Sequence, residues 1–259
     1  MKPTRKQRLA RAKFALPSSV TLLSIACGFG SIVLSVDNAR IGDASNYRMA
    51  ALLLVAAGVF DALDGFVARM TKTSSEFGMQ LDSIADVMNF GCAPAMLLYC
   101  YGFTLLGPEH PTLLRAGGLA CFIFVACGAL RLARFNVSVG RTDPRYFVGM
   151  PITAGAACVA SVVVAWPAPL EQMGQALLLI LLMVAVGTLM VSTIRFPSSK
   201  QKKSPLLFGL LGAGLALLAY LQMQFFVLFF LLYVSATLLI NIGWQLGWRG
   251  LAQPEVYED

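Results

Sequence analysis

The chain has 259 residues, of which 58% are hydrophobic and only 13% are charged. Its mean hydropathy of +0.72 excludes an ordinary soluble domain, in which about half of the residues are apolar and about a quarter are charged. The formal net charge of +7 is then explained by basic cytoplasmic loops of a membrane protein and not by nucleic-acid binding.

The apolar residues gather in runs long enough to cross a membrane, which takes about 20 residues in a helix. The first run follows basic residues and so resembles a signal peptide. Because apolar segments continue along the whole chain, this run is interpreted as a transmembrane helix. No segment carries a strand pattern. We expect an all-α, polytopic membrane bundle of about eight helices, near residues 16–36, 47–69, 82–103, 113–135, 150–168, 173–194, 205–222 and 224–246.

The basic residues are unevenly distributed between the loops. If the N-terminus is cytoplasmic, all but three of the 20 basic residues fall in cytoplasmic segments, the exceptions being Arg40, Arg48 and Arg115. This asymmetry follows the positive-inside rule. We therefore expect both termini, and the polar connection between the second and third helices, at the cytoplasmic side of the cell membrane.

The six cysteines and the single histidine show no disulfide or metal-binding spacing. All cysteines lie in apolar stretches and none belongs to a CxxC pair, so we expect small buried hydrophobic residues. His110 lies in a polar connection beside Pro108 and Pro111, with no neighbouring Cys or His in the sequence that would complete a zinc site.

Four aspartates stand at or near membrane depth, where each charge costs at least about 2.5–3.5 kcal/mol. Asp61 and Asp64 are three residues apart, and Asp82 and Asp86 are four apart, so each pair shares one face of a helix. A short polar connection joins the two helices, which we expect to be antiparallel neighbours. Four converging carboxylates repel one another unless cations lie between them.

The carboxylates and their neighbours indicate phosphoryl-transfer chemistry. Mg²⁺ and Mn²⁺ prefer hard oxygen ligands, and Mg²⁺ is typically held by carboxylates together with substrate phosphates. Two ions about 3.5–4 Å apart would stabilise the attacking and the leaving oxygen. Gly65 and Gly78 leave room for a ligand, and Arg69 can bind a phosphate. A cation-coupled transporter is the alternative from another class, but ion coordination needs neither Gly65 nor Arg69.

The string D-x-x-D-G-x-x-A-R-x8-G-x-x-x-D-x-x-x-D, complete from Asp61 to Asp86, resembles the signature of the CDP-alcohol phosphatidyltransferase family. The resemblance implies transfer of a phosphatidyl group from a CDP-activated lipid, a six-helix core and a homodimer. It assigns the role of general base to Asp86. It assigns the metal ions to Asp61, Asp64, Asp82 and Asp86, and the CDP moiety to Gly65, Ala68, Arg69 and Gly78.

The resemblance also divides the chain. It implies a basic N-terminal segment at residues 1–15, the phosphatidyltransferase core at 16–196, and a C-terminal helical hairpin with a tail at 197–259. Family members of this type carry Pro-Asn-x-x-Thr before the first helix, whereas this chain has Ser18 in place of the Asn. Ser18 lacks the combined donor and acceptor of an amide, while Thr21 keeps the expected role in CDP binding.

Further segments resemble the bacterial and archaeal phosphatidylserine synthases of this family: residues 90–94 (FGCAP), 131–136 (RLARFN) and 147–151 (FVGMP). This resemblance implies CDP-diacylglycerol as donor and L-serine as acceptor, with release of CMP. A zwitterionic amino acid needs a cation for its carboxylate, and the candidates are Arg131, Arg134, Arg141 and Arg145. Glycerol 3-phosphate, inositol phosphate and choline stay open as alternative acceptors.

Overall fold

The structure is a computed structural model that describes residues 5–41, 45–71, 76–138 and 146–197, with short pieces at 234–235, 237–239 and 241–243. Within these ranges, the side chains of residues 5–18, 45, 67–71, 146–147 and 195–197 are outside the description.

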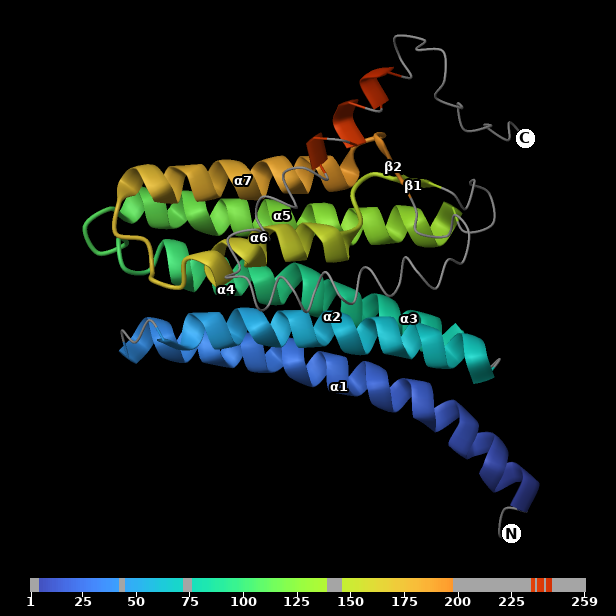
Figure 1. The fold of residues 1–259 in the computed structure, drawn as a ribbon. Coiled ribbons are helices and arrows are strands. Elements are labelled where there is room, and N and C mark those ends of the chain that lie inside the picture. Colours follow the sequence, from blue (N-terminus) through green and yellow to red (C-terminus); the bar gives the residue numbers. More distant parts are fainter. Residues whose placement is uncertain are drawn as a thin grey trace.

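The described chain is a bundle of helices that run alternately in opposite directions (Figure 1). The start of α1, the end of α2, the start of α3 and the end of α5 lie at one end of the bundle, on the right in Figure 1. The helices are α1 (Arg5–Ile41), α2 (Ser45–Thr71), α3 (Glu76–Asp86), the π-helix η1 (Val87–Cys92), α4 (Ala93–Gly102), α5 (Pro111–Ser138), α6 (Ile152–Ala165) and α7 (Met173–Val191).

The predicted all-α membrane bundle is confirmed. Five helical segments of the described chain are long and apolar enough to cross a membrane, and α6 is a shorter apolar helix. This chain is therefore a multi-pass membrane protein. The predicted helices at 205–222 and 224–246 fall largely outside the described residues. The five segments are 19–41, 46–66, 76–102, 111–138 and 173–191.

Some predicted boundaries and one predicted absence are wrong. The first helix begins at Arg5 and not at residue 16, and the third begins at Glu76 and not at residue 82. Polar residues at a helix end do not interrupt the helix, although they end the apolar run that the prediction followed. Two strands, β1 (Tyr146–Val148) and β2 (Arg195–Pro197), also form an antiparallel pair, which three-residue segments are too short to predict.

The helix that contains Asp82 and Asp86 changes geometry directly after Asp86. The π-helix η1 follows, and the N–H of Ala93 donates to the carbonyl of Met88. Pro94 has no N–H to donate to the carbonyl of Phe90. The π-turn therefore lies where the regular series of α-helical backbone hydrogen bonds is already interrupted. Such π-turns are frequent near functional sites.

The π-helix places Asn89 in a buried network that joins three helices. The Asn89 amide donates to Ser24 Oγ at 2.8 Å, and Ser24 Oγ donates to the carbonyl of Ala57 at 2.8 Å. Gly28 makes this approach feasible, because a Cβ there would lie 2.1 Å from Asn89 Oδ1. The network fixes α1 and α2 against the segment that follows Asp86.

Arg134, on α5, connects the C-terminal end of α7 to the chain that enters α6. Its guanidinium donates to the carbonyls of Val191 at 2.9 Å, Val148 at 3.0 Å, Ser192 at 3.1 Å and Met190 at 3.3 Å. A cation near a helix C-terminus is also favoured by the helix dipole. The contacts therefore make Arg134 a structural residue.

The turn beside Arg134 requires a glycine. Gly149 has a φ of 79°, a left-handed conformation that other residues rarely adopt. A Cβ on Gly149 would lie 2.2 Å from the carbonyl oxygen of Met190. The backbone N–H groups of Gly149 and Met150 donate to the carbonyls of Ile194 at 2.8 Å and Leu189 at 3.0 Å. This turn leads directly into α6.

Replacing Arg134 by Gln is expected to destabilise the folded protein, because several carbonyls lose their donor. Partly buried carbonyls left without a partner cost about 1–3 kcal/mol, which lowers the melting temperature of a chain of this size by about 2–10 °C. Thermal unfolding in detergent measures the change. Arg115→Gln, an exposed change at the other end of α5, is the control and should leave the melting temperature unaltered. Equal melting temperatures for both variants would contradict the structural role.

Candidate active site

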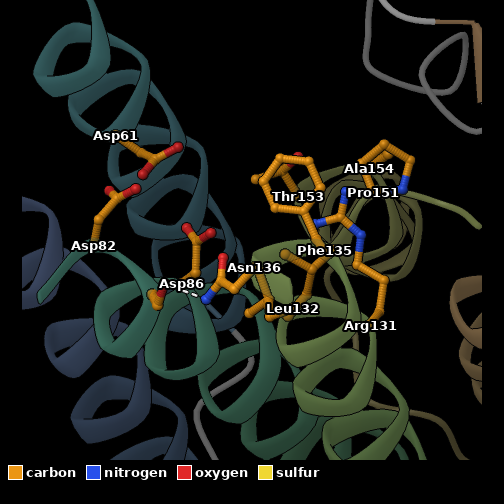
Figure 2. A pocket seen from close by; sticks show the side chains of 12 residues that line it. Asp61, Asp82, Asp86, Arg131, Leu132, Phe135, Asn136, Pro151, Thr153 and Ala154 are labelled. Carbon is orange, nitrogen blue, oxygen red and sulfur yellow. Dashed lines mark hydrogen bonds between the residues drawn. The ribbon is translucent and has the colours of Figure 1, made fainter. Parts of the chain in front are cut away.

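Helices α2 and α3 turn aspartates toward a common space. Asp61 lies on α2, and Asp82 and Asp86 lie on α3, with their carboxyl groups facing one another across the gap between the helices (Figure 2). Asp61 and Asp86 are half-buried, whereas Asp82 is exposed. The carboxyl groups of Asp61 and Asp86 lie within hydrogen-bonding reach of each other, and both interact electrostatically with Asp82.

The side chain of Asp64 contacts α1. It is 7% exposed, and it accepts a hydrogen bond from the hydroxyl of Thr21. Electrostatic interactions still link Asp64 to Asp61 and Asp82. Thr21, predicted to contact CDP, therefore orients one of the four aspartates in this structure.

A pocket of about 650 Å³ opens beside the three facing aspartates. Carboxylates form one wall, the end of α5 forms the opposite wall, and the start of α6 closes the side (Figure 2). The pocket thus offers an anionic wall and a cationic wall to a single ligand. The lining residues are Asp61, Asp82, Ser83, Asp86, Arg131, Leu132, Phe135, Asn136, Pro151, Ile152, Thr153 and Ala154.

The oxygen donors on the carboxylate wall fit a hard divalent cation. Asp86 Oδ1 is buried and has no hydrogen-bond partner among the described residues, so a lone pair remains for a positive ion. Carboxylate oxygens are the ligands that Mg²⁺ and Mn²⁺ prefer. Within the part of the chain that the structure describes, no three carboxylate, imidazole or thiolate groups already stand in a metal-binding arrangement. The chemistry of the donors fits the ion, although a preformed coordination shell is not present among these residues.

Arg131 supplies the positive charge of the pocket. Its side chain is 7% exposed, and its Cζ lies 5.2 Å from the centroid of the Phe135 ring, a distance at which a cation is attracted to an aromatic face. It also interacts electrostatically with Asp86. Contact with the Phe135 ring restrains the position of the guanidinium in the pocket wall.

The arginines predicted to bind the acceptor differ in their positions and contacts. Arg131 lines the pocket, whereas Arg134 is not among the lining residues and contacts the backbone carbonyls described above. Arg141 and Arg145 lie outside the described residues. Among the described arginines of this set, the cationic wall therefore consists of Arg131.

The residues predicted to contact CDP are placed only in part. Gly65 follows Asp64 on α2, and Gly78 lies in the first turn of α3; neither is among the residues that line the pocket. Ala68 and Arg69 belong to the last turns of α2, but their side chains are outside the description. Their assignment to CDP stays a prediction.

Sequence reasoning missed several residues that line the pocket. Ser83, Phe135, Asn136 and Thr153 were not predicted as site residues. Phe135 and Asn136 belong to the segment at 131–136 that carried a resemblance, and Ser83 adjoins Asp82. For Ser83, Phe135 and Asn136, this proximity to predicted site residues was the available signal in the sequence.

Comparisons with known proteins point the same way as the geometry. A CDP-diacylglycerol–serine O-phosphatidyltransferase of Helicobacter pylori is 38% identical over 198 residues, which are 73% of this chain and 75% of that protein. An archaetidylserine synthase of Methanothermobacter thermautotrophicus is 35% identical over 191 residues, covering 71% of this chain and 70% of the relative. A CDP-diacylglycerol–serine O-phosphatidyltransferase of Methanocaldococcus jannaschii is 34% identical over 183 residues, covering 71% and 74%.

The family model for CDP-alcohol phosphatidyltransferases matches residues 14–191, which include α2, α3 and every residue that lines the pocket. Together with the similarity to the three relatives, this match shows that the chain belongs to the CDP-alcohol phosphatidyltransferase family.

Proposed function

We propose that this chain transfers the phosphatidyl group of CDP-diacylglycerol to the hydroxyl of L-serine, releasing CMP and forming phosphatidylserine. The observation that carries the proposal is the single pocket that Asp61, Asp82 and Asp86 line together with the buried cation of Arg131. The names of the relatives support the same donor and acceptor.

We propose that Asp61, Asp64, Asp82 and Asp86 hold divalent cations, with two Mg²⁺ or Mn²⁺ ions as the expected complement. When bound, the ions neutralise the diphosphate of the donor and the charge that develops on the leaving phosphate. The hydroxyl of Thr21 contacts Asp64 and restrains the orientation of that carboxylate, an outer contact of the kind that tunes metal ligands.

Asp86 is the proposed general base for the serine hydroxyl. Its carboxyl group faces the pocket (Figure 2), where it can accept the proton of a bound acceptor. A serine hydroxyl is a weak acid, so the base must lie within hydrogen-bonding reach of it. The network of Asn89 and Ser24 holds the following turn and thereby limits the movement of Asp86.

Arg131 is the proposed partner of the serine carboxylate. A guanidinium presents its donors in a planar fork that matches a carboxylate with two parallel hydrogen bonds. Because Phe135 covers one face of this guanidinium, its position is restrained before the acceptor binds. This restraint lowers the entropic cost of binding.

The position of the pocket fits a reaction between a lipid and soluble substrates. The pocket is lined by residues near the end of the bundle where α1 and α3 begin (Figure 1). The positive-inside rule supports a cytoplasmic location for this end. The acyl chains can remain in the bilayer while CDP and serine enter from the cytoplasm. We propose the cytoplasmic membrane as the location and a homodimer as the assembly. The division at residues 15 and 196 stays a proposal.

Asp82→Asn is expected to reduce CMP release from CDP-diacylglycerol by more than about 100-fold, because the change removes a charged ligand of the proposed ions. Membrane insertion and expression should not change, since Asp82 is exposed and packs no core. Asp37→Asn, at an exposed position of α1, is the matched control. Near-normal turnover of all four Asp→Asn variants at positions 61, 64, 82 and 86 would refute the assignment.

L-Serine is expected to stimulate CMP release, whereas glycerol 3-phosphate, inositol phosphate and choline are not. Arg131→Met should raise the KM for serine by about 10–100-fold, because a hydrogen bond between charged groups is lost, and should leave the KM for CDP-diacylglycerol within about threefold. Steady-state assays in detergent micelles, with Mg²⁺ and Mn²⁺ compared, give both constants. No stimulation of the unmodified protein by serine would remove serine as the acceptor.

A further inference from the structure

Asn136 lies in the pocket at the end of α5 and is connected to α3. Its side-chain nitrogen donates to Ser83 Oγ at 3.0 Å, and Ser83 Oγ donates to the carbonyl of Met79 at 3.0 Å. Both Asn136 and Ser83 line the pocket beside Asp82 and Asp86. The mechanism proposed above uses neither side chain.

This pair of hydrogen bonds fixes which end of the Asn136 amide faces the pocket. A serine hydroxyl has a single hydrogen, and that of Ser83 is directed to Met79. Ser83 Oγ can therefore only accept from Asn136, so the amide must present its nitrogen to α3. The amide oxygen is then left for the pocket, as Figure 2 shows.

The amide oxygen supplies what the two charged walls do not. An amino-acid acceptor brings a carboxylate and an ammonium group in addition to its hydroxyl. Arg131 matches the carboxylate, and the aspartates are engaged with the proposed cations. An ammonium group carries only donors, so it needs an acceptor that is not already committed to a positive ion. Asn136 Oδ1 is a neutral acceptor on the same helix as Arg131.

We propose that Asn136 is a specificity-determining residue whose amide oxygen accepts a hydrogen bond from the ammonium group of the amino-acid acceptor. Ser83 is the positioning residue that holds this oxygen toward the pocket. The proposal rests on the proposed function, because it concerns the acceptor of that reaction. It implies that the pocket distinguishes an amino acid from a hydroxy acid that has the same hydroxyl and carboxylate.

The test compares L-serine with 3-hydroxypropionate, which keeps the hydroxyl and the carboxylate and lacks the ammonium group. The full chain in CDP-diacylglycerol micelles gives kcat and KM for serine and the competitive inhibition constant of 3-hydroxypropionate. The variants are Asn136→Leu, which keeps the size and loses the acceptor, Asn136→Asp, which keeps an acceptor oxygen, and Ser83→Ala, which frees the amide to turn.

Asn136→Leu is expected to raise the KM for serine by about 10–100-fold, the range for a lost hydrogen bond to a charged group. The inhibition constant of 3-hydroxypropionate and the KM for CDP-diacylglycerol should stay within about twofold. Asn136→Asp should restore the KM for serine to within about fivefold of the unmodified protein. Ser83→Ala should raise it less than Asn136→Leu does.

An equal loss of affinity for serine and 3-hydroxypropionate in Asn136→Leu would overturn the proposal, because the change would then act on the pocket as a whole. An unchanged KM for serine in the same variant would also overturn it. These results are separate from a failure of the proposed function, which would show as absent CMP release when serine is added to the unmodified protein.

Discussion

The constraint on which the structure depends is the gathering of four carboxylates, one of them buried and two half-buried, in a membrane bundle. Each charge placed in the bilayer costs at least about 2.5–3.5 kcal/mol, and charges of the same sign add their mutual repulsion. The described residues offset part of this cost: Thr21 donates to Asp64, and Arg131 interacts electrostatically with Asp86. The remaining Asp86 oxygen has no partner among the described residues. Further positive charge lowers the electrostatic cost of such a site, which is the physical basis of the proposed binding of divalent cations and a diphosphate.

A rigid frame is needed to keep these carboxylates facing one another. The frame is the buried network in which Asn89 contacts Ser24, and Ser24 contacts the backbone of α2. The absence of a side chain at Gly28 leaves the space that the Asn89 amide occupies. The π-turn beside Pro94 sets Asn89 toward α1. The π-turn that follows α3 thus contributes to the position of Asp86.

The sequence predicted the membrane bundle and the acidic pairs, because both leave local signals: long apolar runs, and carboxylates where carboxylates are costly. It did not predict the π-helix, the strand pair of Tyr146–Val148 with Arg195–Pro197, or the start of α3 at Glu76. The π-turn and the early start of α3 leave no signal in the apolar pattern, and the strand pair depends on contacts between segments far apart in the chain. The same reason explains Asn136, whose partner Ser83 lies 53 residues away.

Arg131 and Arg134 show most clearly why a residue type does not decide a role. They are three residues apart on α5, and both were predicted to bind the acceptor. Arg131 is buried against Phe135 and lines the pocket, whereas Arg134 donates to the carbonyls at the end of α7 and in β1. Because Arg134 holds the turn that leads into α6, it shapes the wall that Thr153 and Ala154 give to the pocket. One arginine therefore supplies positive charge to the pocket, and the other supports the turn that precedes its α6 wall.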